Sequence, residues 1–193
     1  MNKRIIIVAG HLAAGKTAFA LRLSKELNVP CFIKDTFKEA ICKSAPVTNR
    51  EAGKLFSAVT FDAMTYAAGR LMEAGFPLIL EGNFVPVEVK AADEEGIIEE
   101  LIRKHGYGSL TFILTGDPRV LHERFTRREA LPERGSANNI FSEFTYEDFL
   151  RSAEALGRFN AGGEIVNIDT TDFNAVDFDK YIEAARAFIK FGE

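Results

Sequence analysis

Several residue types are scarce in this 193-residue chain, which has no tryptophan, two cysteines and three histidines. The cysteines, Cys31 and Cys42, are too few for a disulfide framework or a zinc site, so we expect a reduced, cytoplasmic protein. The histidines are widely spaced, which argues against a metal cluster built on them. No segment approaches the roughly 20 consecutive apolar residues of a transmembrane helix, and we expect no membrane partner.

Neither sign of charge dominates, because 28 acidic residues face 24 basic ones and the net charge is −4. A weakly acidic total argues against a surface dedicated to nucleic acid or to anionic membranes. Hydrophobic residues make up 47% of the chain and charged residues 27%, values typical of a folded globular protein. The length fits one domain, which we expect to span residues 1–193.

Short apolar segments alternate along the chain with longer segments of helical periodicity. The first, Ile5–Val8, is a β-branched run typical of a fully buried strand. We expect further strands at residues 31–33, 78–80, 110–114 and 165–168, and helices at 17–27, 36–43, 49–73, 97–104, 120–130, 145–159 and 178–189. This alternation predicts an α/β protein in which helices cover both faces of a parallel sheet.

The clearest motif follows the first predicted strand. Residues 10–17, GHLAAGKT, match the P-loop pattern G-x-x-x-x-G-K-[ST], with a strand before them and a helix after them. The two glycines let backbone N–H groups converge on phosphate oxygens, Lys16 reaches the β- and γ-phosphates, and the Thr17 hydroxyl binds Mg²⁺. We therefore expect a bound nucleoside triphosphate, held by Gly10, His11, Leu12, Ala13, Ala14, Gly15, Lys16, Thr17 and Ala18.

The sequence lacks the motifs that identify other classes of P-loop protein. The N/T-K-x-D motif of GTPases and the L-S-G-G-Q motif of transporter ATPases are absent, and the chain is too short for a motor-type ATPase. The phosphotransferases remain, and the chain resembles small P-loop kinases of the group that holds chloramphenicol phosphotransferase-like and polynucleotide-kinase-like enzymes. That resemblance implies a five-stranded parallel sheet in the order 2-3-1-4-5, a helical lid, and transfer of the γ-phosphate of Mg·ATP to a hydroxyl group.

Two carboxylates follow predicted strands. The resemblance implies that Asp35, after the second strand, accepts or orients the proton of the acceptor alcohol; alternatively, Asp35 caps the helix that follows. The resemblance also implies that Glu81, after the third strand, is a Mg²⁺ carboxylate, with a turn residue as the alternative. Which of the two is the main magnesium carboxylate stays open. We expect Lys34 to be solvated and Asn83 to be a candidate contact of the acceptor hydroxyl.

Arginines dominate the segment after the fourth predicted strand. Arg124 and Arg128 are four residues apart and therefore share a helix face. The resemblance implies that Arg124 packs against the adenine of ATP, and that Arg128 clamps the phosphates and joins Lys16 in countering charge during catalysis. The alternative is a solvated helix whose arginines pair with Glu123 and Glu129.

The resemblance also predicts a lid over about residues 124–145. A loop expected at 131–144 contains Arg134, which could close over the nucleotide as part of that lid. Thr171 follows the fifth predicted strand, where members of the resembled group supply backbone contacts to the adenine.

We expect the acceptor to bind the helices of about residues 36–74. Between residues 36 and 75 the basic and acidic residues balance: Lys38, Lys43, Arg50, Lys54 and Arg70 against Glu39, Glu51, Asp62 and Glu73. Because this is no basic track, we predict a small hydroxyl-bearing acceptor rather than nucleic acid. The alternatives are a nucleoside, nucleotide or polynucleotide 5′-hydroxyl kinase, or a non-catalytic ATP-binding switch. The sequence leaves the acceptor's identity and the oligomeric state open.

Overall fold

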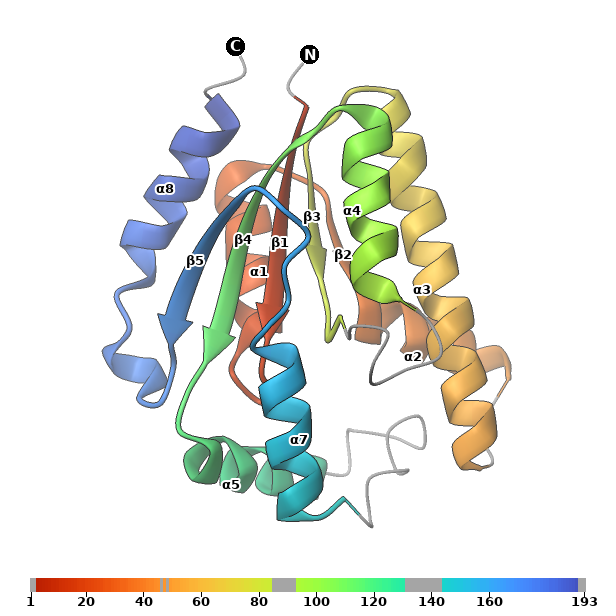
Figure 1. Ribbon diagram of the computed structural model, residues 1–193, viewed down its shortest axis with the longest axis vertical. Helices are drawn as coiled ribbons and strands as arrows, with labels where there is room; N and C mark the ends of the chain where they lie inside the picture. Colours follow the sequence, from red (N-terminus) through yellow and green to blue (C-terminus); the bar gives the residue numbers. More distant parts are fainter. Residues whose placement is uncertain (1–2, 46, 48, 85–92, 131–143, 191–193) are drawn as a thin grey trace.

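The computed structural model describes residues 3–45, 47, 49–84, 93–130 and 144–190 (Figure 1). The strands are β1 (Arg4–Gly10), β2 (Cys31–Ile33), β3 (Leu78–Glu81), β4 (Gly108–Thr115) and β5 (Glu164–Asp169). They form a sheet in the order β2-β3-β1-β4-β5, and every described pairing is parallel. The predicted fold class and strand order are therefore confirmed.

Helices cover both faces of this sheet. They are α1 (Lys16–Leu27), α2 (Lys34–Ser44), α3 (Arg50–Glu73), α4 (Glu94–His105), α5 (Pro118–Glu129), α7 (Tyr146–Leu156) and α8 (Phe178–Lys190), with a short 3₁₀ helix, η3, at Phe173–Ala175. Figure 1 shows α1 and α8 on one face, α3 and α4 on the other, and α5 and α7 near the carboxyl ends of the strands. Within the described ranges, no helix is both long and apolar enough to cross a membrane.

Local chemistry explains where several helices begin. The Asn49 side chain caps α3, and Thr145 and Asp148 cap α7 reciprocally. Helix α4 begins earlier than its periodicity predicts, because Asp93 accepts a hydrogen bond from a backbone N–H of the first turn. Helix α2 also begins earlier than predicted, at Lys34, because the chain passes from β2 directly into the helix.

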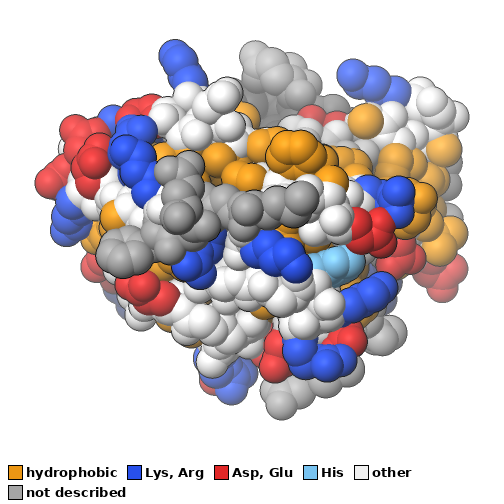
Figure 2. Space-filling view, turned by 90° about the horizontal axis from the view of Figure 1, so that it is seen from above, with side chains coloured by type: hydrophobic (Ala, Val, Ile, Leu, Met, Phe, Trp, Pro, Cys, Tyr) orange, Lys and Arg blue, Asp and Glu red, His pale blue; other side chains and the backbone are white. Residues whose placement is uncertain are grey.

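The strands of the sheet begin at one end of the molecule and finish at the other. The start of β1 and the end of α8 lie where the strands begin (Figure 1), and Figure 2 is viewed from that end. On this face, Lys and Arg side chains are interspersed with Asp and Glu side chains around hydrophobic ones, so no single sign of charge dominates it. The carboxyl ends of the strands, where binding sites of parallel α/β folds form, lie at the opposite end.

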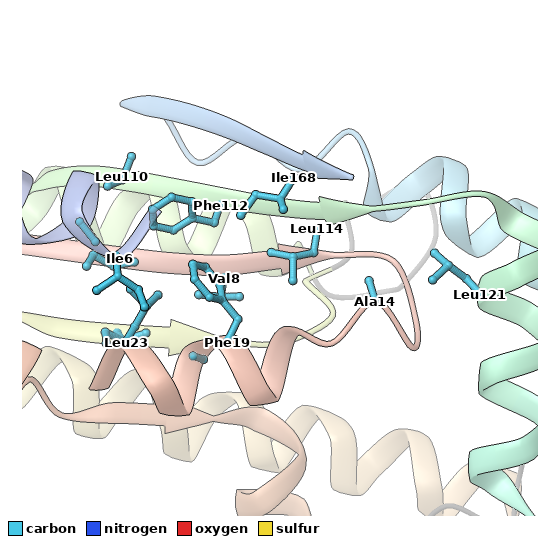
Figure 3. Close-up of a cluster of buried hydrophobic side chains, with 14 of the residues drawn as sticks. Ile6, Val8, Ala14, Phe19, Leu23, Leu110, Phe112, Leu114, Leu121 and Ile168 are labelled. Atoms are coloured by element: carbon cyan, nitrogen blue, oxygen red, sulfur yellow. The ribbon is translucent and has the colours of Figure 1, made fainter. Parts of the chain in front are cut away.

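The hydrophobic core has two parts, separated by the sheet. Side chains of β1 alternate between them, so that Ile6 and Val8 pack with Phe19 of α1, whereas Ile5 and Ile7 pack towards α3 and α4. Figure 3 shows the first part, with residues of β4, β5 and α5 joining it. All of these β1 side chains are fully buried. The P-loop therefore starts from a strand that packing holds on both faces.

Candidate active site

The P-loop is shaped by close backbone contacts that only glycine allows. Gly10 and Gly15 have φ angles of 118° and 86°, in the left-handed region. A Cβ atom at Gly10 would lie 2.1 Å from the carbonyl oxygen of Leu114 in β4, and one at Gly15 would lie 2.2 Å from the ring of Phe173. The loop is thus pressed against β4 at its start and against the segment after β5 at its end.

Lys16 folds back over this loop. It is 7% exposed, and its Nζ donates hydrogen bonds to the carbonyl oxygens of Gly10 at 3.1 Å and His11 at 2.6 Å. The pKa of Lys16 is lowered to about 8, mainly by burial; the charges of Glu81 and Asp35 oppose this shift, and that of Arg128 contributes to it. The ammonium group therefore lies inside the P-loop, where a bound phosphate would meet it.

Thr17 and Glu81 form a pair of oxygen donors beside this lysine. The Thr17 Oγ1 donates to Glu81 Oε2 at 3.3 Å, and Glu81 is 4% exposed. Burial raises the pKa of Glu81 to about 7, and Asp35 adds to that rise, while Lys16 opposes it. A hydroxyl and a carboxylate from two segments are hard oxygen ligands, so this donor set fits Mg²⁺.

A single cavity collects most of the predicted site residues. It is lined by Leu12, Ala13, Gly15, Lys16, Thr17 and Ala18 of the P-loop and α1, and by Asp35, Glu81, Gly82, Asn83 and Arg128. Asp35 is exposed in the first turn of α2, and Ile33 takes the cap position of that helix without any side-chain cap hydrogen bond. The alternative reading of Asp35 as the N-cap is therefore wrong.

Asn83 contributes an unsatisfied polar atom to the same cavity. Its Oδ1 is buried and has no hydrogen-bond partner among the residues that the structure describes. A buried carbonyl oxygen without a partner costs roughly 1–3 kcal/mol, so a ligand that donates a hydrogen bond to it would recover that energy.

The two arginines of α5 have different surroundings. Arg128 lines the cavity, and its guanidinium also contacts the carboxylate of Glu129 at 3.0 Å. Arg124 instead donates to the carbonyl oxygens of Thr170 at 2.7 Å and Thr171 at 2.5 Å. Arg124 and Thr171 thus lie together, and neither is part of the cavity lining.

Some predicted features lie outside the described residues, and the prediction for Lys34 is wrong. Arg134 and the loop at 131–143 lie outside the described ranges. Lys34, expected to be solvated, is 5% exposed and pairs with Glu94 at the start of α4. Sequence reasoning also missed Phe173 beside Gly15. No local motif marks these contacts, since Lys34 and Glu94 are 60 positions apart.

Comparison with known proteins identifies the family. The model of the zeta toxin family matches residues 1–179. The chain belongs to the zeta toxin family. A narrower place in the chloramphenicol phosphotransferase-like group stays a prediction. Among curated proteins, none matches this zeta-family chain.

Solved structures share the fold. A protein from Chloroflexus aurantiacus J-10-fl, proposed to be a kinase, is 23% identical with a TM-score of 0.84, over 97% of this chain and 99% of that one. A gluconokinase from Sinorhizobium meliloti 1021 is 15% identical with a TM-score of 0.56, over 98% and 93%. A shikimate kinase from Acinetobacter baumannii, solved with shikimate, is 14% identical with a TM-score of 0.56, over 96% and 93%. This zeta-family chain therefore has the fold of P-loop kinases.

Proposed function

We propose that this zeta-family protein is a kinase that transfers the γ-phosphate of Mg·ATP to a hydroxyl group of a small molecule. The observation that carries the proposal is that Lys16, Thr17, Glu81 and Asp35 line one cavity. Phosphoryl transfer needs a phosphate cradle, oxygen ligands for the metal and a group that orients the acceptor, all within reach of one another. Side chains that could supply these parts lie together in the cavity at the carboxyl edge of the sheet, which supports the proposal.

In the proposed reaction, the acceptor oxygen bonds to the γ-phosphorus while the bond from that phosphorus to the β,γ-bridging oxygen breaks. The proton of the acceptor hydroxyl passes to the carboxylate of Asp35, and ADP leaves. Lys16 and Arg128 stabilise the negative charge that moves onto the leaving oxygen. Thr17 and Glu81 would hold Mg²⁺, which would neutralise charge on the phosphates.

Binding of ATP requires Lys16 to change partners. Its Nζ now donates to two backbone carbonyls of the P-loop, and these bonds would give way to bonds with phosphate oxygens. Charge-assisted bonds to phosphate are stronger than bonds to a neutral carbonyl, so the exchange favours binding. We also propose that Arg124 and Thr171 contact the nucleotide, with a lid over residues 124–145.

The acceptor side favours a small polar molecule. The buried Oδ1 of Asn83 and the carboxylate of Asp35 line the same cavity and could each accept a hydrogen bond from a hydroxyl. Phe61 and Met64 of α3 are buried in the core and do not line this cavity. The gluconokinase and the shikimate kinase of the same fold are named for small hydroxyl-bearing acceptors, which supports this class.

A labelling screen tests the proposal. The protein would receive γ-³²P-ATP, Mg²⁺ and a panel of sugars, sugar acids, nucleosides and hydroxyl-bearing antibiotics, with 5′-hydroxyl oligonucleotides at equal concentration. We expect label on a small molecule, and none with Lys16→Ala. Label on the oligonucleotide that falls steeply with salt would indicate a polynucleotide kinase. ATP binding without any transfer would indicate a switch protein.

A further inference from the structure

A buried ion pair lies directly behind Asp35. Lys34 precedes Asp35 in the first turn of α2, and its Nζ is 2.5 Å from Oε1 of Glu94 in the first turn of α4. The two side chains are 7% and 2% exposed. Removing two charges from water costs several kcal/mol for each ion, and proteins in which apolar residues of similar volume replace a buried ion pair are often equally stable. Stability alone therefore does not explain the Lys34–Glu94 pair.

Lys34 contacts three other segments. Besides Glu94 of α4, its Nζ lies 5.3 Å from the ring centroid of Phe61 in α3. A Cβ atom at Gly82 would lie 3.1 Å from the Cβ of Lys34, so the lysine stem packs against the backbone that follows Glu81. The first turn of α2 is thereby fixed against α3, α4 and the end of β3.

Asp35 is the next residue after this anchored lysine. Lys34 is buried and Asp35 is exposed to the cavity, so the two neighbours project in different directions from one helical turn. The side chain of the N-cap residue, Ile33, caps no N–H group, and the bond from the Thr36 hydroxyl to the Ile33 carbonyl oxygen at 2.8 Å stays within the same turn. Because consecutive side chains of a helix keep a fixed angle between them, holding Lys34 also holds the direction of Asp35.

We infer that the Lys34–Glu94 pair is a positioning device that holds the Asp35 carboxylate towards the P-loop. This inference rests on the proposed kinase function. Neither Lys34 nor Glu94 lines the cavity, so the pair can affect the reaction only through residues that do, and Asp35 is the one next to Lys34 in the chain. In phosphoryl transfer, where positioning supplies most of the catalysis, a displacement of about 1 Å can cost about 10²-fold in rate.

The first test uses Glu94→Gln, which keeps the size of the side chain and removes its charge. We expect kcat with the acceptor from the labelling screen to fall at least about tenfold, while the Kd of Mg·ATP stays within about twofold. Glu99→Gln, an exposed position on the same helix, is the matched control and should keep the wild-type kcat. A kcat of Glu94→Gln within twofold of wild type, or a comparable loss of ATP affinity, would overturn the inference.

A double-mutant cycle separates positioning from a general structural effect. If Glu94 acts through Asp35, adding Glu94→Gln to Asp35→Asn should cause no further loss of kcat. Losses of kcat that simply multiply would contradict the inference.

If Glu94→Gln does not fold, the double variant Lys34→Met, Glu94→Leu replaces the pair by apolar side chains and should keep the fold. In that variant too, kcat should fall; a wild-type kcat would count against the pair.

NMR spectroscopy tests the pair even if no acceptor is phosphorylated, a result that would contradict the proposed function but not the positioning of Asp35. In protein labelled with ¹³C-aspartate, the carboxyl signal that disappears in Asp35→Asn is assigned to Asp35. We expect Glu94→Gln to shift or broaden that signal and Glu99→Gln to leave it in place. An unchanged Asp35 signal in Glu94→Gln would show that the pair does not position this carboxylate.

Discussion

The proposed nucleotide side and the proposed acceptor side of the cavity are built in different ways. The phosphate cradle consists of consecutive residues, 10–17, whose conformation follows from two glycines and from the buried strand that precedes them. The acceptor side instead collects Asp35, Glu81 and Asn83 from separate segments, with a buried ion pair behind them. The conformation of the P-loop is thus determined locally, whereas the placement of Asp35, Glu81 and Asn83 depends on tertiary packing.

Removing the P-loop lysine should have the largest effect on the nucleotide side. Lys16→Ala deletes the ammonium group that would meet the phosphates, so we expect Mg·ATP affinity to drop and transfer to become undetectable, with the fold intact. Calorimetry measures the affinity, and circular dichroism checks the fold. Lys25→Ala, an exposed lysine of the same helix, is the control. Unchanged ATP affinity in Lys16→Ala would contradict the assignment of the nucleotide side.

On the acceptor side, Asp35→Asn should separate chemistry from nucleotide binding. The amide cannot take the acceptor's proton, so kcat should fall by about 10²–10⁴ while the Kd of Mg·ATP stays unchanged. Steady-state kinetics with the identified acceptor and calorimetry give the two values. Glu39→Gln, exposed on the same helix, should behave as wild type. A kcat within a few-fold of wild type would remove Asp35 from the mechanism.

Glu81 lies where the two sides meet, and its titration should affect stability. Its pKa is about 7 in the folded chain against an ordinary 4.5, so between these pH values the folded state holds a proton that the unfolded state has lost. Raising the pH through this window therefore lowers stability. Without Mg²⁺, Glu81→Gln should be more stable than wild type at pH 8 by on the order of 3 kcal/mol, and its transfer activity should be lost.

Urea denaturation at pH 4.5 and pH 8 measures this effect. The free energy of unfolding of the wild type should decrease relative to that of Glu81→Gln as the pH rises from 4.5 to 8. Equal differences between the two proteins at both pH values would show that Glu81 does not carry this proton.

The smallest expected effect concerns Arg124. Its guanidinium donates to two adjacent carbonyl oxygens, of Thr170 and Thr171, and a lysine cannot reproduce that fork. Arg124→Lys should therefore weaken Mg·ATP binding a few-fold and leave the kcat at saturating ATP unchanged. Arg119→Lys, exposed on the same helix, is the control for calorimetry. An unaltered Kd would limit Arg124 to a structural role.

The fold and the position of the P-loop could be predicted from the sequence because both depend on short-range patterns. A buried β-branched run, a glycine motif and the caps at Asn49 and Thr145 can each be read within a few residues. The ends of helices were less predictable, as α4 shows, since Asp93 extends it beyond its apolar pattern. The expected solvation of Lys34 failed because only packing brings Glu94 close to it.

In the proposed mechanism, nucleotide and acceptor meet directly in one cavity, with Asp35 across from the P-loop. The stereochemical course of transfer tests it most directly: the acceptor is phosphorylated with ATP whose γ-phosphate is made chiral by oxygen isotopes. Direct in-line transfer predicts inversion at phosphorus in the product. Retention would mean that the phosphoryl group first passes to a residue of the protein, and it would contradict the account.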